Sequence, residues 1–288
     1  MRNKKFLILL VLCLGLLFSA QAEPVVSYLG PQGTYSQEAS QVFFDMQGTF
    51  IPFGSVSKTV QALVEGKCDY AVIPQENTIG GAVLDYVDVL IANKEVSVCG
   101  EVELLISQNL LAFPGTKLSD IKEVFSHKQG IIQGREWLAK NIPGAKVTEV
   151  SSTAEGARLV SEKKNSAYAA ISSAACADVY GLEIIAPGIQ SSNKNKTRFY
   201  VLSLKEPADE PAQRLAFIAT GKAGNLPALM SEMKKKKMTL IAIHDRPRKT
   251  ELGEYYYLIE CAGTYKNYQK LAGKSGFDLR YLGSFNVR

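Results

Sequence analysis

The sequence has few of the residues that bind transition metals. Only two of its 288 residues are histidines, His127 and His244, and no two of its five cysteines form a Cys-x-x-Cys pair. Structural zinc sites use closely spaced cysteine and histidine ligands, so the sequence argues against such a site. The cysteines beyond residue 22 are Cys68, Cys99, Cys176 and Cys261. Their spacing does not define a disulfide pairing, and we expect buried free thiols.

Long apolar runs are also missing, except for one near the start of the chain. It covers residues 6–18, follows the basic segment "MRNKK" and precedes the small-residue pattern Ala-Gln-Ala, which ends at Ala22. This order is typical of a secretory signal peptide. The run is shorter than the about 20 apolar residues of a membrane-spanning helix. We therefore expect residues 1–22 to be removed and the protein to be secreted, into the periplasm, without a membrane segment.

The chain lacks a strong excess of charge of either sign. Its formal net charge is +5, and loss of the three basic residues of "MRNKK" would lower it to +2. Nucleic-acid binding needs a basic stripe or a stacking motif. The one dense basic run, Lys234–Lys237, is typical of the solvated end of a helix. The composition therefore argues against a nucleic-acid partner.

Residues 25–205 alternate short β-rich segments with amphipathic helical segments. "VVSYL" precedes "YSQEASQVFFDM", and "STAEGARLVSEK" precedes "AYAAIS". The alternation predicts α/β units with a largely parallel sheet. The longer apolar stretch "VSVCGEVELLISQNLLAF" predicts one or two strands without a helix, which suits a crossing between lobes. We expect two lobes around a cleft, one from about 25–100 with 190–205 and one from 101–189.

The last part of the chain has a different organisation. Residues 206–213, "EPADEPAQ", have two prolines and three acidic residues without periodicity, which is typical of a linker. Residues 214–288 then follow the order strand, helix, strand, strand, helix, strand. This order predicts a small ferredoxin-like module that forms its own core or shares one with a second copy.

Two polar clusters directly follow predicted strands of the first lobe. In "GPQGTYS", Thr34 and Ser36 present hydroxyls beside two glycines at a helix N-terminus, which makes either an anion-binding cradle or an ordinary turn. In "PQENTIGG", Glu76 and Asn77 follow a buried strand. Open α/β sheets bind ligands at the carboxyl ends of their strands. We therefore expect Glu76 and Asn77 to act in hydrogen bonding or lobe closure.

Two further clusters lie at predicted helix starts of the second lobe. In "SHKQ", Ser126, His127 and Gln129 end a strand and begin a helix. A lone histidine without a visible acidic partner is more often structural than catalytic. In "SSTAEGA", Ser152 and Glu155 have the spacing of a capping box.

The segment "NKTRF" introduces the alternating apolar run "FYVLSL". It contains Asn195, Thr197 and Arg198. Because side chains alternate along a strand, we expect Thr197 and Phe199 on one face and Arg198 on the other. In the simplest interpretation, Arg198 pairs with an acidic residue and Thr197 begins the strand.

These segments, in this order and followed by a βαββαβ region that ends in "YLGSF", resemble the prephenate dehydratase family. The resemblance extends over about residues 25–285. It implies a two-lobed periplasmic-binding-protein-like (type II) catalytic domain over 23–205 and an ACT regulatory domain over 214–288. The implied reaction, in phenylalanine biosynthesis, is the loss of carbon dioxide and water from prephenate to give phenylpyruvate. Aromatisation drives this reaction, so it implies no metal, flavin or nucleotide cofactor.

The resemblance ties Thr197 to catalysis. A threonine hydroxyl is too weak an acid to titrate near neutral pH, so we expect it to donate a hydrogen bond to the leaving oxygen. A cation on the departing carboxylate would favour the ground state. We therefore expect Arg198 to hold the pyruvyl carboxylate or to brace the strand. The expected substrate-binding residues are Thr34, Ser36, Glu76, Asn77, Ser126, Gln129, Ser152, Thr153, Asn195 and Arg198.

The sequence departs from the family pattern in several places. The second motif has Gln75 and Thr78 where the family usually has isoleucine and serine, and Lys128 replaces a proline after the histidine. The two segments that sense phenylalanine depart more. They read Gly224, Asn225 and Leu226, and His244, Asp245, Arg246 and Pro247. Asn225 is polar and His244 replaces a carboxylate, so we expect phenylalanine to be a weak effector at most, and the module to serve mainly in a homodimer or homotetramer.

Two other functions remain open at this point. Arogenate, the amino analogue of prephenate, is an alternative substrate. A non-catalytic exported solute-binding or sensor protein would suit the same two-lobed fold. The trio Asn195, Thr197 and Arg198 argues against the binder, which has no need of it. The exported setting implies prephenate formed outside the cytoplasm by a separate chorismate mutase.

Overall fold

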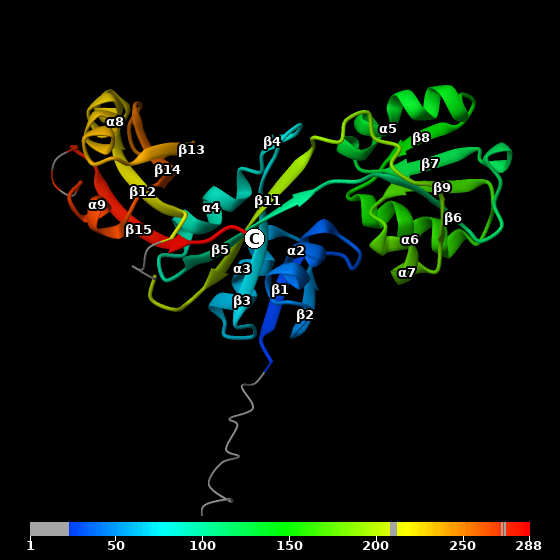
Figure 1. The fold of residues 1–288 in the computed structure, drawn as a ribbon, viewed down its shortest axis with the longest axis horizontal. Helices are drawn as coiled ribbons and strands as arrows, with labels where there is room; N and C mark the ends of the chain where they lie inside the picture. Colours follow the sequence, from blue (N-terminus) through cyan, green and yellow to red (C-terminus); the bar gives the residue numbers. More distant parts are fainter. Residues whose placement is uncertain (1–22, 208–211, 272, 274) are drawn as a thin grey trace, which may run out of the picture.

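The computed structural model describes residues 23–207, 212–271, 273 and 275–288. The expected signal peptide and half of the expected linker, residues 208–211, lie outside these residues. Figure 1 shows two lobes and a C-terminal module that lies against the first lobe, on the side away from the second.

The first lobe has a mixed sheet of strand order β2-β1-β3-β11-β5, with β4 beside β3. Its strands are β1 (Val25–Leu29), β2 (Thr49–Phe53), β3 (Tyr70–Asn77), β4 (Gly81–Ala82), β5 (Ser97–Leu105) and β11 (Lys196–Ser203), and its helices are α2 (Tyr35–Phe43), α3 (Val56–Val64) and α4 (Asp85–Ala92). Helix α3 begins where Ser55 caps it and buries Val56, Val60 and Leu63, which lie on one helical face.

The second lobe has a sheet of order β10-β6-β9-β7-β8. Its strands are β6 (Asn109–Ala112), β7 (Glu123–Ser126), β8 (Lys146–Glu149), β9 (Tyr168–Ser172) and β10 (Glu183–Ala186), and its helices are η1 (Leu118–Asp120), α5 (Lys128–Asn141), α6 (Thr153–Lys163) and α7 (Ala175–Tyr180). The chain crosses between the lobes twice, from β5 to β6 and from β10 to β11 (Figure 1).

The two-lobed periplasmic-binding-protein-like architecture predicted from the sequence is confirmed, with one correction. The sheets are not largely parallel. Strands β1, β2 and β3 pair in parallel, as do β7, β8 and β9, but β11 is antiparallel to both β3 and β5, and β6 is antiparallel to β9 and β10. The antiparallel strands belong to the crossings, which enter each sheet without a covering helix between them.

The C-terminal module has the predicted βαββαβ order. It consists of β12 (Arg214–Lys222), η2 (Ala223–Asn225), α8 (Leu226–Lys235), β13 (Thr239–Pro247), β14 (Glu254–Ala262), α9 (Tyr265–Gln269) and β15 (Asp278–Phe285). The antiparallel sheet has the order β13-β14-β12-β15. This is the ferredoxin-like arrangement. Helix α9 is shorter than the segment "TYKNYQKLAGKSG" suggests.

Strand β12 of the module is buried on both faces. Leu215 and Phe217 of β12 pack into the module's own core. Ala216 and Ile218, which alternate with them, pack with Tyr200 and other residues of the first lobe. The module therefore has its own core, as predicted, and in addition shares one with the first lobe.

The last residues of the chain join the module to the first sheet. Within β5, the Glu101 amide donates to the Asn286 carbonyl (3.2 Å), and the Arg288 amide donates to the Glu101 carbonyl (3.0 Å). Gly283 lies so close to β5 that a Cβ atom would collide with the carbonyl oxygen of Val98. The module and the first lobe are thus built as one unit.

The four cysteines of the described residues are free thiols, as expected. Burial raises the pKa of Cys99 to about 11 and that of Cys261 to about 12. Among the described residues, no helix is long and apolar enough to cross a membrane.

Candidate active site

Thr197 lies at the start of β11, directly opposite Asn77 at the end of β3. The Asn77 side-chain amide donates to the Thr197 hydroxyl over 2.8 Å. Asn77 is itself fixed, because its Oδ1 atom accepts from the backbone amides of Ile79 (3.0 Å) and Gly80 (2.8 Å). Since the Thr197 oxygen accepts from Asn77, its own hydrogen is directed elsewhere. The pair therefore presents an oriented hydroxyl donor.

A β-bulge in β3 produces this arrangement. Opposite β11, Arg198 pairs with Glu76 but Phe199 pairs with Pro74, so Gln75 is an extra residue of β3. A bulge changes which face of a strand the following side chains reach. Proline, which has no amide hydrogen, is found in sheets mainly at edges and bulges. Pro74 was thus the signal in the sequence from which the bulge could have been predicted.

The second lobe reaches this pair through Gln129, in the first turn of α5. A Cβ atom on Gly80 would lie 2.9 Å from the Gln129 Nε2 atom and 3.4 Å from the Asn77 Oδ1 atom. Any side chain at position 80 would therefore displace Gln129. The structure thus brings together three residues predicted from separate motifs: Thr197, Asn77 and Gln129.

Asn195 is the most unusual polar residue near Thr197. Its side chain is 1% exposed, yet neither its Nδ2 nor its Oδ1 atom has a hydrogen-bond partner. Buried polar atoms are almost always paired. The same is true of atoms on Gln108, Gln129, Gln133 and Ser172. Gln108 lies in a crossing, Ser172 ends β9, and Gln129 and Gln133 lie in α5, so a ligand bound between the lobes could supply their missing partners. Unpaired buried atoms of Tyr28, Arg248 and Ser275 lie elsewhere.

Three of these residues, Gln108, Gln133 and Ser172, were not among the site residues predicted from the sequence. The only signal for Gln108 was a polar residue within the apolar stretch "VSVCGEVELLISQNLLAF". Gln133 and Ser172 lie within a helix and a strand that gave no separate signal.

Ser126 and His127 have structural contacts. The Ser126 hydroxyl is buried and donates to the Ile171 carbonyl over 2.7 Å. His127 caps α5, with its Nδ1 atom accepting from the Gln129 amide. This agrees with the structural interpretation of a lone histidine.

Ser152 caps α6 by accepting from the Glu155 amide over 3.0 Å. The Glu155 carboxylate pairs with Arg158 and does not complete the predicted capping box. Ser152 lines a cavity of about 460 Å³ between the lobes, together with Pro31 of the first lobe. Thr153 lies close to Gly130 in the first turn of α5. Both hydroxyl residues therefore lie on the second lobe's side of the cleft.

The segment "GPQGTYS" holds the lobes together. The Thr34 hydroxyl contacts the carbonyls of Leu29 and Pro31, both over 3.0 Å, and the Gly33 amide donates to Gln37 over 2.7 Å. The Gly33 carbonyl accepts from Ser173 of the second lobe over 2.7 Å. These contacts favour the turn over the anion cradle. The neighbouring Ser36 is buried in the first turn of α2.

We expect Gly33→Ala to destabilise the protein by at least about 2 kcal/mol. The backbone of Gly33 has φ +83°, and a Cβ atom would lie 2.6 Å from the Cys176 sulfur across the lobe interface. Urea unfolding measures the change. Cys176→Ala removes the colliding atom, so the alanine should cost less in that background. An equal cost in both backgrounds would assign the whole effect to the backbone.

Arg198 lies on the opposite face of β11 from Thr197, as predicted. Its guanidinium binds Glu101 (Nε to Oε1 2.7 Å), Glu76 (3.2 Å) and Glu260 of the C-terminal module. The Arg198 side chain is 13% exposed. Of the two expected roles, these contacts favour bracing of the strand over binding of the substrate carboxylate. Glu76 likewise belongs to this ion-pair cluster.

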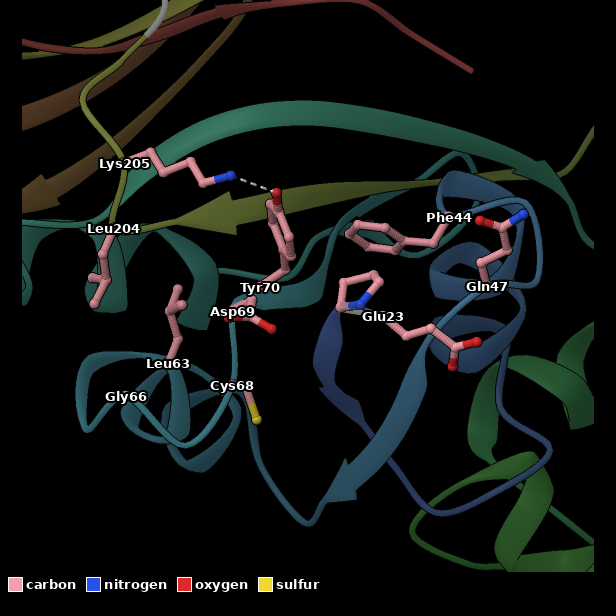
Figure 2. A pocket seen from close by; sticks show the side chains of 11 residues that line it. Glu23, Phe44, Gln47, Leu63, Gly66, Cys68, Asp69, Tyr70, Leu204 and Lys205 are labelled. Carbon is pink, nitrogen blue, oxygen red and sulfur yellow. Dashed lines mark hydrogen bonds between the residues drawn. The ribbon is translucent and has the colours of Figure 1, made fainter. Parts of the chain in front are cut away.

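A cavity of about 760 Å³ lies away from Thr197 (Figure 2). It lies at the amino end of β3, where the Lys205 ammonium donates to the Tyr70 hydroxyl over 2.9 Å. Asn77 is at the other end of this strand. At about 3.3 Å per residue, the two ends are about 23 Å apart. This cavity is therefore separate from Thr197.

Together, fold and site define a two-lobed α/β protein with an oriented threonine hydroxyl beside a buried, unpaired asparagine side chain. The profile of the prephenate dehydratase family matches residues 26–207, more than half of the chain. The chain belongs to the prephenate dehydratase family.

Relatives agree with this assignment over most of the chain. A bifunctional chorismate mutase/prephenate dehydratase from Neisseria gonorrhoeae is 33% identical over 268 residues, covering 90% of this chain and 74% of the relative. A prephenate dehydratase from Lactococcus lactis is 30% identical, covering 91% of this chain and 97% of the relative.

Solved structures show the same fold. A prephenate dehydratase from Arthrobacter aurescens, in complex with L-Phe, has a TM-score of 0.81 at 28% identity and covers 91% of this chain and 89% of its own. GqqA, described as a novel type of quorum quenching acylase, has a TM-score of 0.83 at 21% identity, covering 91% and 98%. At that identity the second likeness concerns the fold alone.

Proposed function

We infer that the chain is a lyase that converts prephenate to phenylpyruvate, carbon dioxide and water. The observation that carries this function is the Thr197 hydroxyl, oriented by Asn77 at the cleft. Family membership and relatives at about 30% identity over most of the chain support it.

The reaction consumes one proton. The bond between the ring and its carboxylate breaks and releases carbon dioxide, the electron pair enters the ring, and the hydroxyl group on the opposite side leaves as water. Thr197 donates a hydrogen bond to that leaving oxygen, which stabilises the negative charge that develops on it. Asn77 acts by holding the threonine oxygen, so that the hydroxyl hydrogen points toward the substrate.

Neutral donors suit the rest of this site. A cation on the departing carboxylate would stabilise the charge that is being lost, which favours the ground state over the transition state. The amides of Asn195 and Gln129 can hold the dianion without this penalty. The guanidinium of Arg198 is already bound by carboxylates.

One experiment tests the function and its alternatives. The protein without residues 1–22 is given prephenate or arogenate, and phenylpyruvate and phenylalanine are measured. Phenylpyruvate from prephenate supports the proposal, and phenylalanine from arogenate indicates the amino analogue. No product from either would favour a non-catalytic solute-binding protein.

We further propose that the protein is exported and that residues 214–288 are an ACT domain. The pattern of residues 1–22 supports export, and the βαββαβ order and strand order of the module support the second assignment. A homodimer or homotetramer formed through this module is part of the same proposal. Fractionation of the native host and light scattering test these points.

We expect L-phenylalanine, the ligand of the Arthrobacter aurescens relative, to inhibit this protein weakly or not at all. In the corresponding segments, Arg246 pairs with Asp88 of the first lobe (2.6 Å), the His244 ring packs edge-on against Tyr86, and Asn225 donates to the Gly276 carbonyl over 3.2 Å. These side chains are engaged within the protein. Activity is measured during a phenylalanine titration, and complete inhibition at micromolar concentration would contradict the expectation.

A further inference from the structure

The carboxylate of Glu260, in β14 of the C-terminal module, is bound mainly by the first lobe. The residue is 1% exposed. Its Oε1 atom accepts from Arg198 and from Arg214 (3.1 Å). Its Oε2 atom accepts from the Tyr200 hydroxyl (2.7 Å) and the Gln75 amide (3.4 Å). Four donors fix this carboxylate, and all except Arg214 belong to the first lobe.

Arg198 links this carboxylate to the reacting hydroxyl, because it directly follows Thr197 in β11. Glu101 and Glu260 hold the guanidinium from two sides, on the face opposite Thr197. Burial would lower the pKa of Arg198, but the hydrogen bond to Glu101 and the charge of Glu260 raise it overall. The arginine is therefore a fixed cation, and its position sets that of the adjacent peptide.

Gln75 links the same carboxylate to the other strand of the site. It is the extra residue of the β3 bulge, 1% exposed, two residues before Asn77. Buried strand positions ordinarily carry apolar side chains. The glutamine of this chain instead reaches Glu260.

We propose that Glu260 is a positioning residue for the reaction. Through Arg198 and Gln75 it fixes the ends of the two strands that hold Thr197 and Asn77, so the geometry of the cleft depends on the docked C-terminal module. A displacement of about 1 Å in a catalytic site can cost up to about 10²-fold in rate. The inference rests on the proposed function, because it assigns a role in that reaction.

Glu260→Gln is the first test, since glutamine keeps the shape and an acceptor for Tyr200 but removes the charge that holds Arg198. We expect kcat to fall about tenfold while KM changes less than about twofold. Glu254→Gln is the matched control. Glu254 lies in the same strand, and its carboxylate accepts from Arg248 (3.0 Å) and Thr250 (2.7 Å) within the module. This control should leave kcat unchanged.

Two readouts separate positioning from a general loss of stability. In the Thr197→Val background, Glu260→Gln should have no further effect on kcat, because the group being positioned is absent. Hydrogen exchange at the amides of residues 196–199 should become faster in Glu260→Gln and stay unchanged in Glu254→Gln. The exchange measurement does not depend on activity.

Four results would contradict the positioning role of Glu260 or the proposed function. Unchanged kcat and unchanged exchange, or an equal loss of kcat in the Thr197→Val background, would overturn the positioning role. If Glu260→Gln does not fold, Gln75→Ile replaces it, with kcat expected to fall about threefold and exchange at 196–199 to rise; no change in either would overturn the role. A wild-type protein without lyase activity would refute the proposed function, and the exchange result would still show whether Glu260 controls the strand end.

Discussion

Thr197→Val is expected to lower kcat for prephenate by about 10²–10³-fold. Valine has the shape of threonine but no hydroxyl, so the leaving oxygen loses its hydrogen-bond donor while the packing of β11 is retained. Because that bond strengthens as charge develops on the oxygen, we expect KM to change little. Formation of phenylpyruvate under steady-state conditions measures both constants.

Two variants control this result. Thr197→Ser keeps a hydroxyl opposite Asn77 and should recover part of the activity. Thr49→Val makes the same substitution in β2, at an exposed strand position away from the cleft, and should leave kcat unchanged. If Thr197→Val retained wild-type turnover, the hydroxyl could not be the donor to the leaving group.

Arg198→Met is expected to lower the free energy of unfolding by about 3 kcal/mol. Methionine fills much of the same space but leaves the buried carboxylates of Glu101 and Glu260 with fewer donors. Removing one partner of a buried ion pair leaves a charge that is costly to bury. Arg214, which also pairs with both carboxylates, remains and keeps the loss at the lower end of the usual range.

The loss should depend on pH. Burial already raises the pKa of Glu101 in the wild-type protein, and removal of the Arg198 cation raises it further. A carboxyl group whose pKa is raised in the folded state is protonated at low pH, where its burial costs little. As the pH rises through that pKa the group becomes charged, and its burial lowers the free energy of unfolding. The difference in free energy of unfolding between wild type and variant should therefore narrow as the pH falls from neutral through the raised pKa of Glu101.

Arg246→Met is the matched control for this prediction. Arg246 also pairs with a carboxylate, that of Asp88, but both side chains are considerably more exposed than the Arg198 cluster. Exposed ion pairs contribute at most about 1 kcal/mol. If Arg198→Met and Arg246→Met lowered the free energy of unfolding equally, the buried ion pairs of Arg198 would contribute no more to stability than the exposed pair of Arg246.

Sequence patterns predicted the parts of the molecule that local rules govern. The alternation in "FYVLSL" placed Thr197 and Arg198 on opposite faces of a strand, and the structure confirms this through Asn77 on one side and Glu101 on the other. The order of elements likewise predicted two lobes and a ferredoxin-like module. Each of these inferences depended on periodicity within one segment.

Contacts between distant segments could not be predicted in this way. Nothing in "EYYYLIECAG" indicated that Glu260 would bind Arg198 and Gln75, because the partners lie 62 and 185 residues away. The face of β12 that packs on the first lobe looked like any buried strand face. The bulge at Gln75 changes which face of the sheet the following side chains of β3 reach. Pro74 was its only sign in the sequence.

The pairing of residues 286–288 with β5 affects how the first lobe folds. Strand β11, which lies between β3 and β5, comes from residues 196–203, and the outer neighbour of β5 comes from residues 286–288. This sheet is therefore complete only when residues 286–288 have paired with β5. Sheets that depend on such distant pairings fold slowly. For the exported protein proposed above, slow completion of this sheet would lengthen the time in which the chain can be translocated before it folds.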